Sequence, residues 1–510
     1  MTPPTVVHLL ASAAAEAPEA EALVLDGERL TYREYAACAA SLSAVLRGLG
    51  VDGNRVATLL PNSLEACIAA FAVHAAGAQT APLNPLYTAR ELGFILRDAA
   101  PGVLIVDAAR ADTARPLAQE AGIPQLLVVG PGGMDLLAAR GGPPNLTLPD
   151  PDSLALLQYT GGTTGHPKGV ELTHRAIAAN VAQRDGLLPT RRLPDEPPGE
   201  RILVMMPLFH SYGMGMGLFL AAWCRGALVI RPRYHPVDTL EAVACERITL
   251  FPGSPTVFTG LLAHPDMAAT DWSTVHTCYS GSAPLSEQTL RRWEEAVGAP
   301  VLEGYGQTEA GPILTYNPAR GIRKPGSVGI PLAHTQVQIV DVETGTRVRG
   351  PGERGEIRAR GPQIMRGYRA RPAETAEALR GGWLYTGDIG EFDADGYLFI
   401  RDRKKDMAIV GGYNGYPREI DELLFLHPDV ADAASVGVPD AYRGETIVAY
   451  VVLRDGARAT VADLLDHCRA HLAKYKVPAA VEVLDALPRT TVNKTDKKAL
   501  RERAQSGGSA

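Results

Sequence analysis

The sequence has little of what several large classes of protein depend on. Its six cysteines are scattered over 510 residues without a CxxC pair. This indicates reduced, mostly buried thiols and favours neither a disulfide framework nor a zinc site. No stretch reaches the roughly eighteen uninterrupted apolar residues that a membrane-spanning helix requires. The first residues lack a basic segment and carry acidic residues early, which is not typical of a signal peptide. We therefore expect a soluble cytoplasmic protein with no integral membrane segment.

The charge and length of the chain indicate which partners and how many structural units to expect. The formal net charge is −7 and no long basic run is present, which argues against a nucleic-acid partner. The hydrophobic fraction of 46% is that of an ordinary globular protein. Because single hydrophobic cores stop growing beyond about 250–300 residues, the length predicts about two to four structural units.

Apolar periodicity indicates how these units follow one another. Residues 1–150 alternate helical and strand patterns, and a second such block runs over about 173–317, which predicts parallel β/α layers. From Gly326, short alternating strands with glycine turns predict a small β-rich subdomain. After Arg403–Asp406 the chain restarts as a compact α+β unit. The tail, Gln505–Ala510, is of low complexity and predicts disorder.

The most distinctive stretch is the loop of residues 160–169, TGGTTGHPKG. Its glycines allow positive φ angles, so consecutive N–H groups can point into one concavity, while threonine hydroxyls and Lys168 add donors. Such a loop suits a polyphosphate. It is not a Walker A loop, because Pro167 stands where that motif has a glycine before the lysine. The alternative is a flexible surface turn.

Three further segments carry residues that a nucleotide could use. The small residues of Ser280–Leu285 (SGSAPL) would let a flat ring approach the backbone. In EGYGQTE, Tyr305 between two glycines can lie against a purine, Thr308 can donate to a phosphate, and Glu309 offers a hard oxygen ligand for Mg²⁺. In WLYTGDI, Asp388 can accept both ribose hydroxyls. The alternatives are plain turns, a packed tyrosine and a solvated glutamate.

Three more segments are less specific by themselves. PLFHSYGMGMG carries His210, and a lone histidine is more often a packed residue than a catalyst. The charge cluster of Arg401–Gly412 indicates a solvated linker. Pro488–Arg501 carries Lys494 close to two other lysines, so a surface lysine is the alternative there.

Taken in order, these segments resemble the adenylate-forming, or AMP-binding, superfamily. The loop has glycine at Gly161, where serine is commoner in the superfamily. In this respect it is most similar to the loop of bacterial medium- and long-chain fatty acid–CoA ligases. The resemblance covers nearly the whole chain and implies an α/β fold. A large N-terminal domain (1–402) would contain two β/α layered subdomains and a small β-barrel-like subdomain. A hinge (403–406) would join it to a small α+β C-terminal lid domain (407–510).

The resemblance also implies roles for the residues at matching positions. Lys494 would stabilise the first transition state, with Thr164 and Glu309 as further catalytic residues and Mg²⁺ ligands. Lys405 would lie in the hinge about which the C-terminal domain reorients between half-reactions. The acyl pocket would include His210, Gly213 and Gly281, and coenzyme A would meet Gly411, Gly412 and Tyr413. The ATP site would comprise Thr160, Gly161, Gly162, Thr163, Thr164, Lys168, Gly281, Ser282, Ala283, Gly304, Tyr305, Gly306, Thr308, Asp388, Arg403 and Lys494.

The implied activity is that of an acyl-CoA synthetase, an AMP-forming acid–thiol ligase that uses Mg²⁺, ATP and coenzyme A. Phe209–Met216 contains no carboxylate, which disfavours an amino-acid substrate. Its glycines would leave a roomy apolar wall if they face the pocket, so we predict a medium- to long-chain fatty acid, with an aromatic acid as runner-up.

Two rival classes remain open. An acyl-AMP ligase would deliver to a carrier protein, but no insertion separates Asp388 from Arg403. A non-catalytic nucleotide-binding scaffold should have lost Lys494 or Glu309, and both are present. Asn493 and Gly415 depart from the family pattern, and the sequence leaves open their effect, the oligomeric state (a homodimer included) and control by lysine acetylation.

Overall fold

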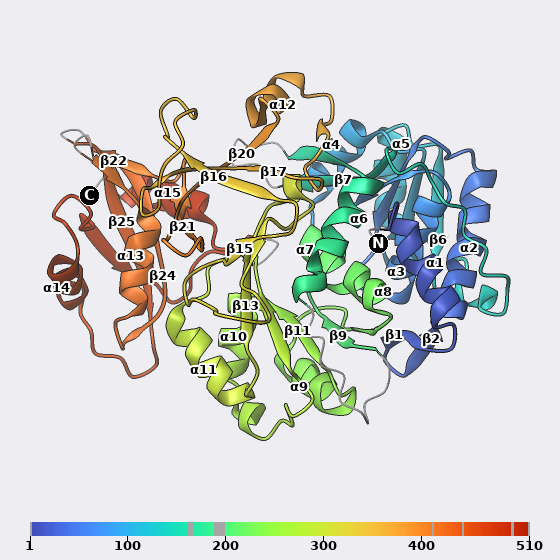
Figure 1. Ribbon diagram of the computed structural model, residues 1–510, viewed down its shortest axis with the longest axis horizontal. Helices are drawn as coiled ribbons and strands as arrows, with labels where there is room; N and C mark the ends of the chain where they lie inside the picture. Colours follow the sequence, from blue (N-terminus) through green and yellow to red (C-terminus); the bar gives the residue numbers. More distant parts are fainter. Residues whose placement is uncertain are drawn as a thin grey trace.

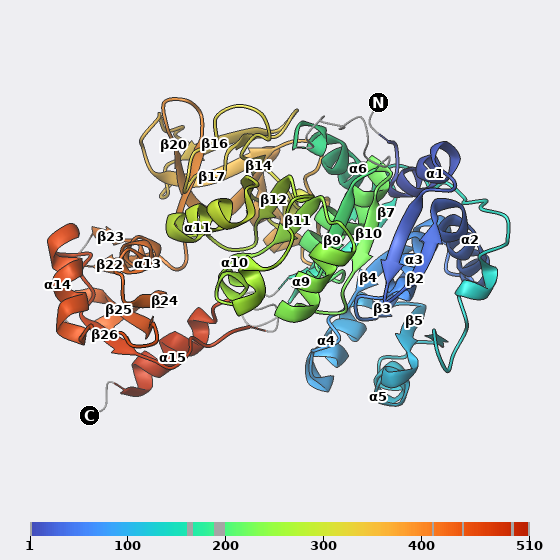
Figure 2. The ribbon, with the colours of Figure 1, turned by 90° about the horizontal axis from the view of Figure 1, so that it is seen from below.

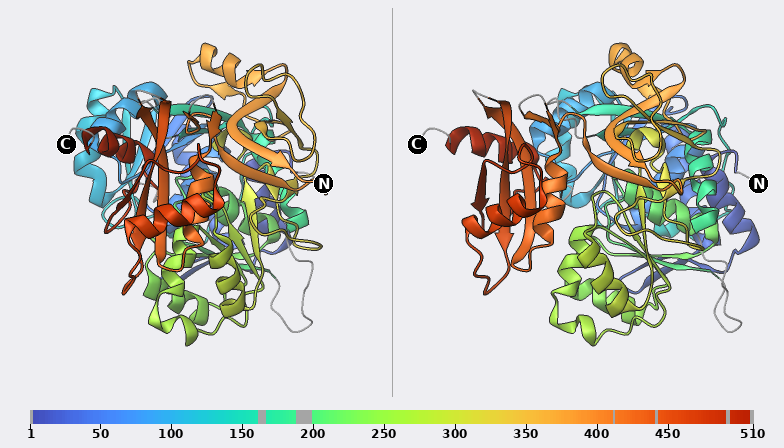
Figure 3. Two further views of the ribbon diagram at one scale, coloured as in Figure 1. Left: turned by 90° about the vertical axis from the view of Figure 1, so that its left-hand side faces the viewer. Right: turned by 60° about the vertical axis from the view of Figure 1, so that its left-hand side comes forward.

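The computed structural model describes residues 3–160, 167–187, 199–410, 413–440, 443–490 and 494–507. Two large sheets and one small sheet form the N-terminal part of the molecule, and a fourth sheet lies in a C-terminal unit, red in Figure 1. Figure 3 shows this unit standing beside the rest of the molecule. The predicted α/β fold class is confirmed. Among the described residues, no helix is both long and apolar enough to span a membrane.

One large sheet has seven strands in the order β18-β8-β7-β4-β3-β5-β6. Its parallel centre consists of β3 (Arg55–Leu59), β4 (Gln79–Pro82), β5 (Val103–Asp107), β6 (Gln125–Val129) and β7 (Leu154–Thr160). An antiparallel edge is added by β8 (Lys168–Thr173) and β18 (Gly367–Tyr368). Because carboxyl ends of parallel strands meet at one edge of a sheet, β4 and β7 end side by side, and ligands commonly bind there.

The other large sheet has nine strands in the order β15-β14-β13-β12-β11-β9-β10-β1-β2. Their bounds are β1 (Glu21–Leu25), β2 (Glu28–Thr31), β9 (Arg201–Val204), β10 (Ala227–Ile230), β11 (Leu250–Gly253), β12 (Thr277–Ser280), β13 (Val301–Tyr305), β14 (Thr315–Tyr316) and β15 (Ile330–Pro331). The two sequence blocks do not map one to one onto the sheets, because β1 pairs in parallel with β10 of the second block. Figure 2 shows these blue strands beside green β10.

Helix starts follow the local sequence closely. Thr31 and Glu34 form a reciprocal capping box at the start of α2 (Tyr32–Gly48), and Thr88 and Glu91 do the same at α4 (Ala89–Ala99). The side chain of Thr173 caps α6 (His174–Ala182) by accepting a hydrogen bond from the N–H of Ala176. The other helices of this part are α1 (Val6–Glu16), α3 (Leu64–Ala75), α5 (Ala108–Glu120), α7 (Ser211–Gly213), α8 (Leu220–Cys224), α9 (Pro236–Cys245), α10 (Pro255–Leu262), α11 (Glu287–Val297) and α12 (Pro372–Ala378). Shorter turns are the 3-10 segments η1 (Leu137–Ala139), η2 (Gln183–Leu187), η4 (Pro265–Ala268) and η5 (Thr308–Ala310) and the π-helix η3 (Met214–Phe219).

The largest core cluster joins the two large sheets through the helices α1, α2 and α3. Helix α3 is apolar on nearly all its sides. It is therefore buried almost all round. A second cluster lies between the nine-stranded sheet and α9, α10 and α11. Its centre is aromatic: the fully buried Trp293 lies 4.6 Å from Phe258 and 5.3 Å from Trp272, measured between ring centres.

The small sheet contains β16 (Gln336–Val340), β17 (Gly355–Arg360), β19 (Leu379–Arg380), β20 (Trp383–Phe392) and β21 (Leu398–Arg403). The C-terminal unit contains β22 (Ala408–Val410), β23 (Tyr413–Gly415), β24 (Val430–Asp440), β25 (Gly444–Leu453), β26 (Ala480–Val483), α13 (Pro417–Phe425), α14 (Val461–His471) and α15 (Lys497–Gly507). The predicted disorder of the tail is wrong for residues 505–507, because α15 extends to Gly507 and buries Leu500 against β24 and β25. Residues 508–510 lie outside the described residues.

Replacing Trp293 with alanine is expected to lower the free energy of unfolding by about 3–5 kcal/mol, because it leaves a large cavity in the aromatic cluster. Urea denaturation followed by circular dichroism would measure this. Val237, half exposed on α9, provides the control, and Val237→Ala should change stability by less than about 0.5 kcal/mol. Equal losses in the two variants would contradict the assignment of this core.

Candidate active site

The β7–β8 hairpin frames the predicted phosphate loop. Thr160 at the end of β7 pairs with Lys168 at the start of β8. The ammonium of Lys168 lies 5.1 Å from the centre of the Tyr368 ring, within the range of a cation–π contact. The hairpin thus fixes both ends of the loop. The predicted residues between them, Gly161, Gly162, Thr163 and Thr164, lie outside the described residues.

A buried carboxylate, Asp388 on β20, is held by residues of two sheets. Its Oδ2 accepts a 2.6 Å hydrogen bond from the hydroxyl of Tyr305 at the end of β13. Its Oδ1 lies 3.3 Å from Nε of Arg403, the residue opposite it on β21. The Asp388 carboxylate raises the pKa of Arg403, so this guanidinium stays charged. Three predicted nucleotide-binding residues are therefore brought together.

Thr308 and Glu309 lie on η5, directly after the Tyr305 segment. Oε1 of Glu309 accepts a 2.8 Å hydrogen bond from the hydroxyl of Tyr368, whose ring also contacts Lys168. Thr308 is buried, and its hydroxyl lies 3.4 Å from that of Ser211. Tyr368 therefore links the carboxylate predicted for Mg²⁺ to the lysine of the phosphate loop. Tyr368 carries no local sequence signal, because nothing near it in the chain connects its short strand to either residue.

The two glycines that flank Tyr305 are required by packing. A Cβ built on Gly306 would lie 1.9 Å from the carbonyl oxygen of Pro312, and one on Gly304 would lie 2.3 Å from the ring of Tyr316. Neither distance is compatible with a side chain. The glycines therefore hold the Tyr305 segment close to the chain that follows it, whatever ring Tyr305 meets.

The segment after β12 combines a packed glycine with an exposed, strained serine. A Cβ at Gly281 would lie 2.9 Å from the ring of Tyr212. Ser282 adopts a φ of 72°, which is uncommon for a residue other than glycine, and both Ser282 and Ala283 are exposed. Residues held in such conformations cluster at ligand sites.

His210 caps the short helix α7 that leads into the π-helix η3. Its Nδ1 accepts a 3.2 Å hydrogen bond from the N–H of Tyr212. Burial, together with the charge of Lys494, lowers the pKa of His210 to about 3, so the ring is neutral. π-Helices are rare and often mark functional sites. The missing Cβ of Gly213 faces the carbonyl of Pro207 at 2.3 Å, so packing accounts for this glycine, and its place in an acyl pocket stays a prediction.

Lys494 reaches this cluster from the C-terminal unit. Burial, followed by the charge of Arg403, lowers the pKa of Lys494 to about 8, while Asp388 opposes the shift. Lys494 therefore lies near Asp388, Arg403 and His210. The unit is held in this place by the N–H of Arg418, which donates 3.0 Å to Oδ2 of Asp402, and by the ion pair of Arg354 with Glu419 at 3.4 Å.

The residues predicted for coenzyme A and for the hinge are less completely described. Gly411 and Gly412 lie outside the described residues, and Tyr413 begins β23, where its backbone pairs with Val410. Lys405 lies in the turn between β21 and β22, where burial and the charge of Arg403 lower its pKa.

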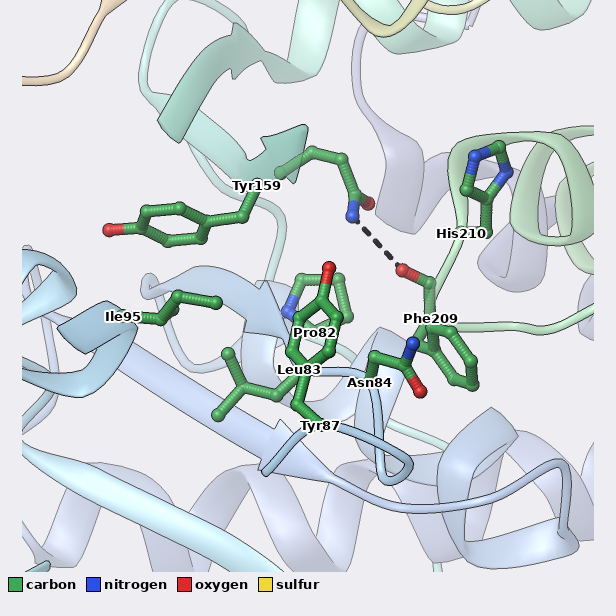
Figure 4. Close-up of a pocket in the computed structure, with 9 residues that line it drawn as sticks. Pro82, Leu83, Asn84, Tyr87, Ile95, Tyr159, Phe209 and His210 are labelled. Carbon is green, nitrogen blue, oxygen red and sulfur yellow. Dashed lines mark hydrogen bonds between the residues drawn. The ribbon is translucent and has the colours of Figure 1, made fainter. Parts of the chain in front are cut away.

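A cavity of about 20 Å³ opens beside His210, at the carboxyl ends of β4 and β7 (Figure 4). Asn84 and Gln158 line it, and each is only 4% exposed. Neither residue can be recognised from the sequence, because a lone amide carries no distinctive pattern. Among the described residues, no group of three or more histidine, cysteine or acidic side chains is arranged to hold a metal ion.

Comparison with known proteins finds similar sequences and a similar solved structure. The sequence model of the AMP-binding enzyme matches residues 10–369, and that of the AMP-binding enzyme C-terminal domain matches residues 419–494. A long-chain-fatty-acid–CoA ligase of Bacillus subtilis (strain 168) is 38% identical over 98% of this chain and 94% of its own. A feruloyl-CoA synthase of Amycolatopsis sp. is 40% identical over 95% and 96%. The crystal structure of ATP-bound MatB from Rhodopseudomonas palustris superposes with a TM-score of 0.90, at 33% identity, over 98% of this chain and 99% of that one.

Replacing Gly306 with alanine is expected to displace the Tyr305 segment, because the new methyl group would overlap the carbonyl of Pro312. The loss of stability should exceed about 2 kcal/mol. Thermal unfolding, compared with Gly48→Ala, would measure it. Gly48 closes α2 with nothing near its missing Cβ, so that variant should be neutral or stabilising. A Gly306→Ala protein as stable as the control would show that the close contact is absent in solution.

Proposed function

The chain belongs to the AMP-binding enzyme family and is an acyl-CoA synthetase, and on that premise we propose that it activates a medium- to long-chain fatty acid. ATP and coenzyme A are the co-substrates, and the acid passes through an acyl-adenylate. The observation that carries the proposed site is that buried Lys494 lies within the range of electrostatic interaction with Asp388, Arg403 and His210. A mobile lysine at this point can act on charge that develops between an attacking carboxylate and a phosphate.

We propose two half-reactions at this site. A carboxylate oxygen of the acid attacks the α-phosphorus of ATP, and the bond from that phosphorus to the bridging oxygen breaks, so pyrophosphate leaves. The thiol of coenzyme A then attacks the carbonyl carbon of the mixed anhydride. AMP leaves with the electron pair of the broken C–O bond, and the thiol proton is released. The products are the thioester, AMP and pyrophosphate.

Each described residue has a proposed task in the first half-reaction. Asp388 accepts the ribose hydroxyls, with Tyr305 and Arg403 fixing its orientation. Lys168 and the phosphate loop hold the leaving pyrophosphate. Lys494 stabilises negative charge in the transition state, and removing one such donor commonly costs roughly 10²–10³ in rate. The neutral ring of His210 lines the space between the nucleotide and the acid, without an acid–base task.

Glu309 fits the Mg²⁺ that the family implies. It is a hard oxygen donor beside the lysine of the phosphate loop, and Mg²⁺ usually takes one or two carboxylates and completes its shell with phosphates and water. When bound, Mg²⁺ would neutralise phosphate charge.

We further propose that residues 403–406 are the hinge between an N-terminal domain (1–402) and a C-terminal domain (407–510). Rotation about a few such residues would carry Lys494 away after the first half-reaction and admit coenzyme A. The closed lid would also exclude water, which hydrolyses the mixed anhydride.

An aryl acid is the second candidate substrate. The ring of Tyr212 covers Gly281, and the missing Cβ atoms of Gly215 and Gly217 face Arg184 and Val204. These contacts leave less open space along η3 than the sequence pattern suggests, which favours a shorter, flatter acyl group. Pyrophosphate release with a panel of fatty and aryl acids, with and without coenzyme A, tests the proposal. No release with any acid would refute it.

The two half-reactions should separate in a Lys494→Ala variant. Pyrophosphate release is expected to fall about 10²–10³-fold, whereas thioester formation from supplied acyl-AMP should persist. Stopped assays of each half-reaction would measure the two rates. Lys498, exposed on α15 of the same unit, provides the control, and Lys498→Ala should keep both rates. Equal loss of both steps in Lys494→Ala would contradict the assigned role.

The adenylation rate should depend on pH through Lys494. Because burial lowers its pKa to about 8, its charge is complete well below pH 8 and is lost as the pH rises through that value. The kcat/KM for ATP reports groups of the free enzyme, so it should decline above pH 8. A Lys494→Arg variant that retains measurable activity should show no such decline up to about pH 10, because arginine stays protonated. If kcat/KM declined above pH 8 in both the wild-type protein and Lys494→Arg, the titration would belong to another group.

A further inference from the structure

Tyr368 on β18 contacts two side chains of opposite charge that the proposed mechanism uses. Its hydroxyl donates a 2.8 Å hydrogen bond to Oε1 of Glu309, and the centre of its ring lies 5.1 Å from the ammonium of Lys168. Among the described residues, neither Glu309 nor Lys168 makes an ion pair. At longer range, Glu309 interacts with Arg403 and Lys168 with Glu374. The two charges therefore share one tyrosine but are not paired with each other.

The backbone of the same segment is hydrogen-bonded to both sides of the site. Strand β18 pairs with β8, the strand that begins with Lys168. Shortly before Tyr368, the N–H of Met365 donates 2.9 Å to the carbonyl oxygen of Glu309. The N–H of Tyr368 itself donates 2.9 Å to Oγ1 of Thr375 on α12. The backbone therefore holds the Tyr368 side chain next to both the phosphate hairpin and η5.

A tyrosine can serve both neighbours without carrying a charge near neutral pH. The negative face of its ring attracts an ammonium, and its hydroxyl donates to a carboxylate. Without this side chain, Lys168 and Glu309 would be free to form a direct ion pair, because opposite charges at contact attract strongly outside bulk water. Such a pair would occupy the ammonium that the proposed site uses to hold the leaving pyrophosphate.

We propose that Tyr368 is a positioning residue that keeps Lys168 and Glu309 apart and available for the phosphates of ATP. It acts through these two residues and not by contact with the substrate. The inference rests on the proposed function. It adds to that function an uncharged residue, from a strand outside the sequence motifs, that prepares the site before the nucleotide binds.

The affinity for ATP tests this role. Titration calorimetry with ATP, in magnesium-free buffer and without an acid, measures binding in the absence of turnover. Tyr368→Leu removes both contacts and should raise the Kd for ATP about tenfold. Tyr368→Phe keeps the ring but not the hydrogen bond, so it should raise the Kd about threefold.

A double-mutant cycle distinguishes positioning from a general loss of structure. In a Glu309→Gln background, the uncharged glutamine cannot capture Lys168, so adding Tyr368→Leu should change the Kd for ATP by less than about twofold. A merely structural role would give the same loss in both backgrounds. If circular dichroism shows that Tyr368→Leu does not fold, the cycle is made with Tyr368→Phe, whose smaller loss should also vanish in the Glu309→Gln background.

Tyr397 provides a matched control. The centre of its ring lies 4.7 Å from the ammonium of Lys324, and its hydroxyl donates 2.5 Å to the carbonyl oxygen of Ile322. Neither partner belongs to the proposed site. Tyr397→Leu should therefore leave the Kd for ATP unchanged.

An unchanged Kd for ATP in both Tyr368 variants would overturn the inference. So would equal losses in the wild-type and Glu309→Gln backgrounds, which would assign Tyr368 to stability alone. Neither result touches the proposed function, which fails only if the wild-type protein releases no pyrophosphate with any acid.

Discussion

The buried carboxylate of Asp388 is the point on which the arrangement of the site depends. Removing a carboxylate from water is costly unless other groups replace the lost hydrogen bonds. Tyr305 and Arg403 replace them, and they come from the end of the nine-stranded sheet and from the small sheet. This carboxylate therefore joins the two sheets at the site. Lys494, from the C-terminal unit, enters the same electric field.

Three cations lie in the electric field of this carboxylate: Arg403, Lys405 and Lys494. Burial, followed by the charge of Arg403, lowers the pKa of both Lys405 and Lys494, so Arg403 repels each of these ammonium groups. The negative charge of a bound polyphosphate would attract these cations and offset the repulsion between them. An acidic protein, with a net charge of −7, thereby attracts a strongly anionic substrate through a local concentration of positive charge.

The sequence was most informative where the signal is local. The short strands β16 and β17 lie in the small β-rich subdomain that the pattern from Gly326 onward predicts. Pairing across the chain was not predictable, because the short strand β1 contains nothing that specifies β10 as its neighbour. The same limit hid Tyr368 and the amides of Asn84 and Gln158, whose partners come from distant segments. Gly304 and Gly306 were identified by motif, but their packing against Tyr316 and Pro312 requires coordinates.

The exchange of strands between the two halves of the N-terminal part has a consequence for how the chain acquires its fold. The nine-stranded sheet contains residues from β1 at position 21 to β15 at position 331, and the seven-stranded sheet is completed only by β18 at positions 367–368. Neither sheet is contained within one of the two sequence blocks. During synthesis, the early strands cannot pair until strands hundreds of residues away have been made. Such pairing between distant segments slows folding. The chain therefore offers no simple boundary at which one of the two large sheets could be exchanged as a module.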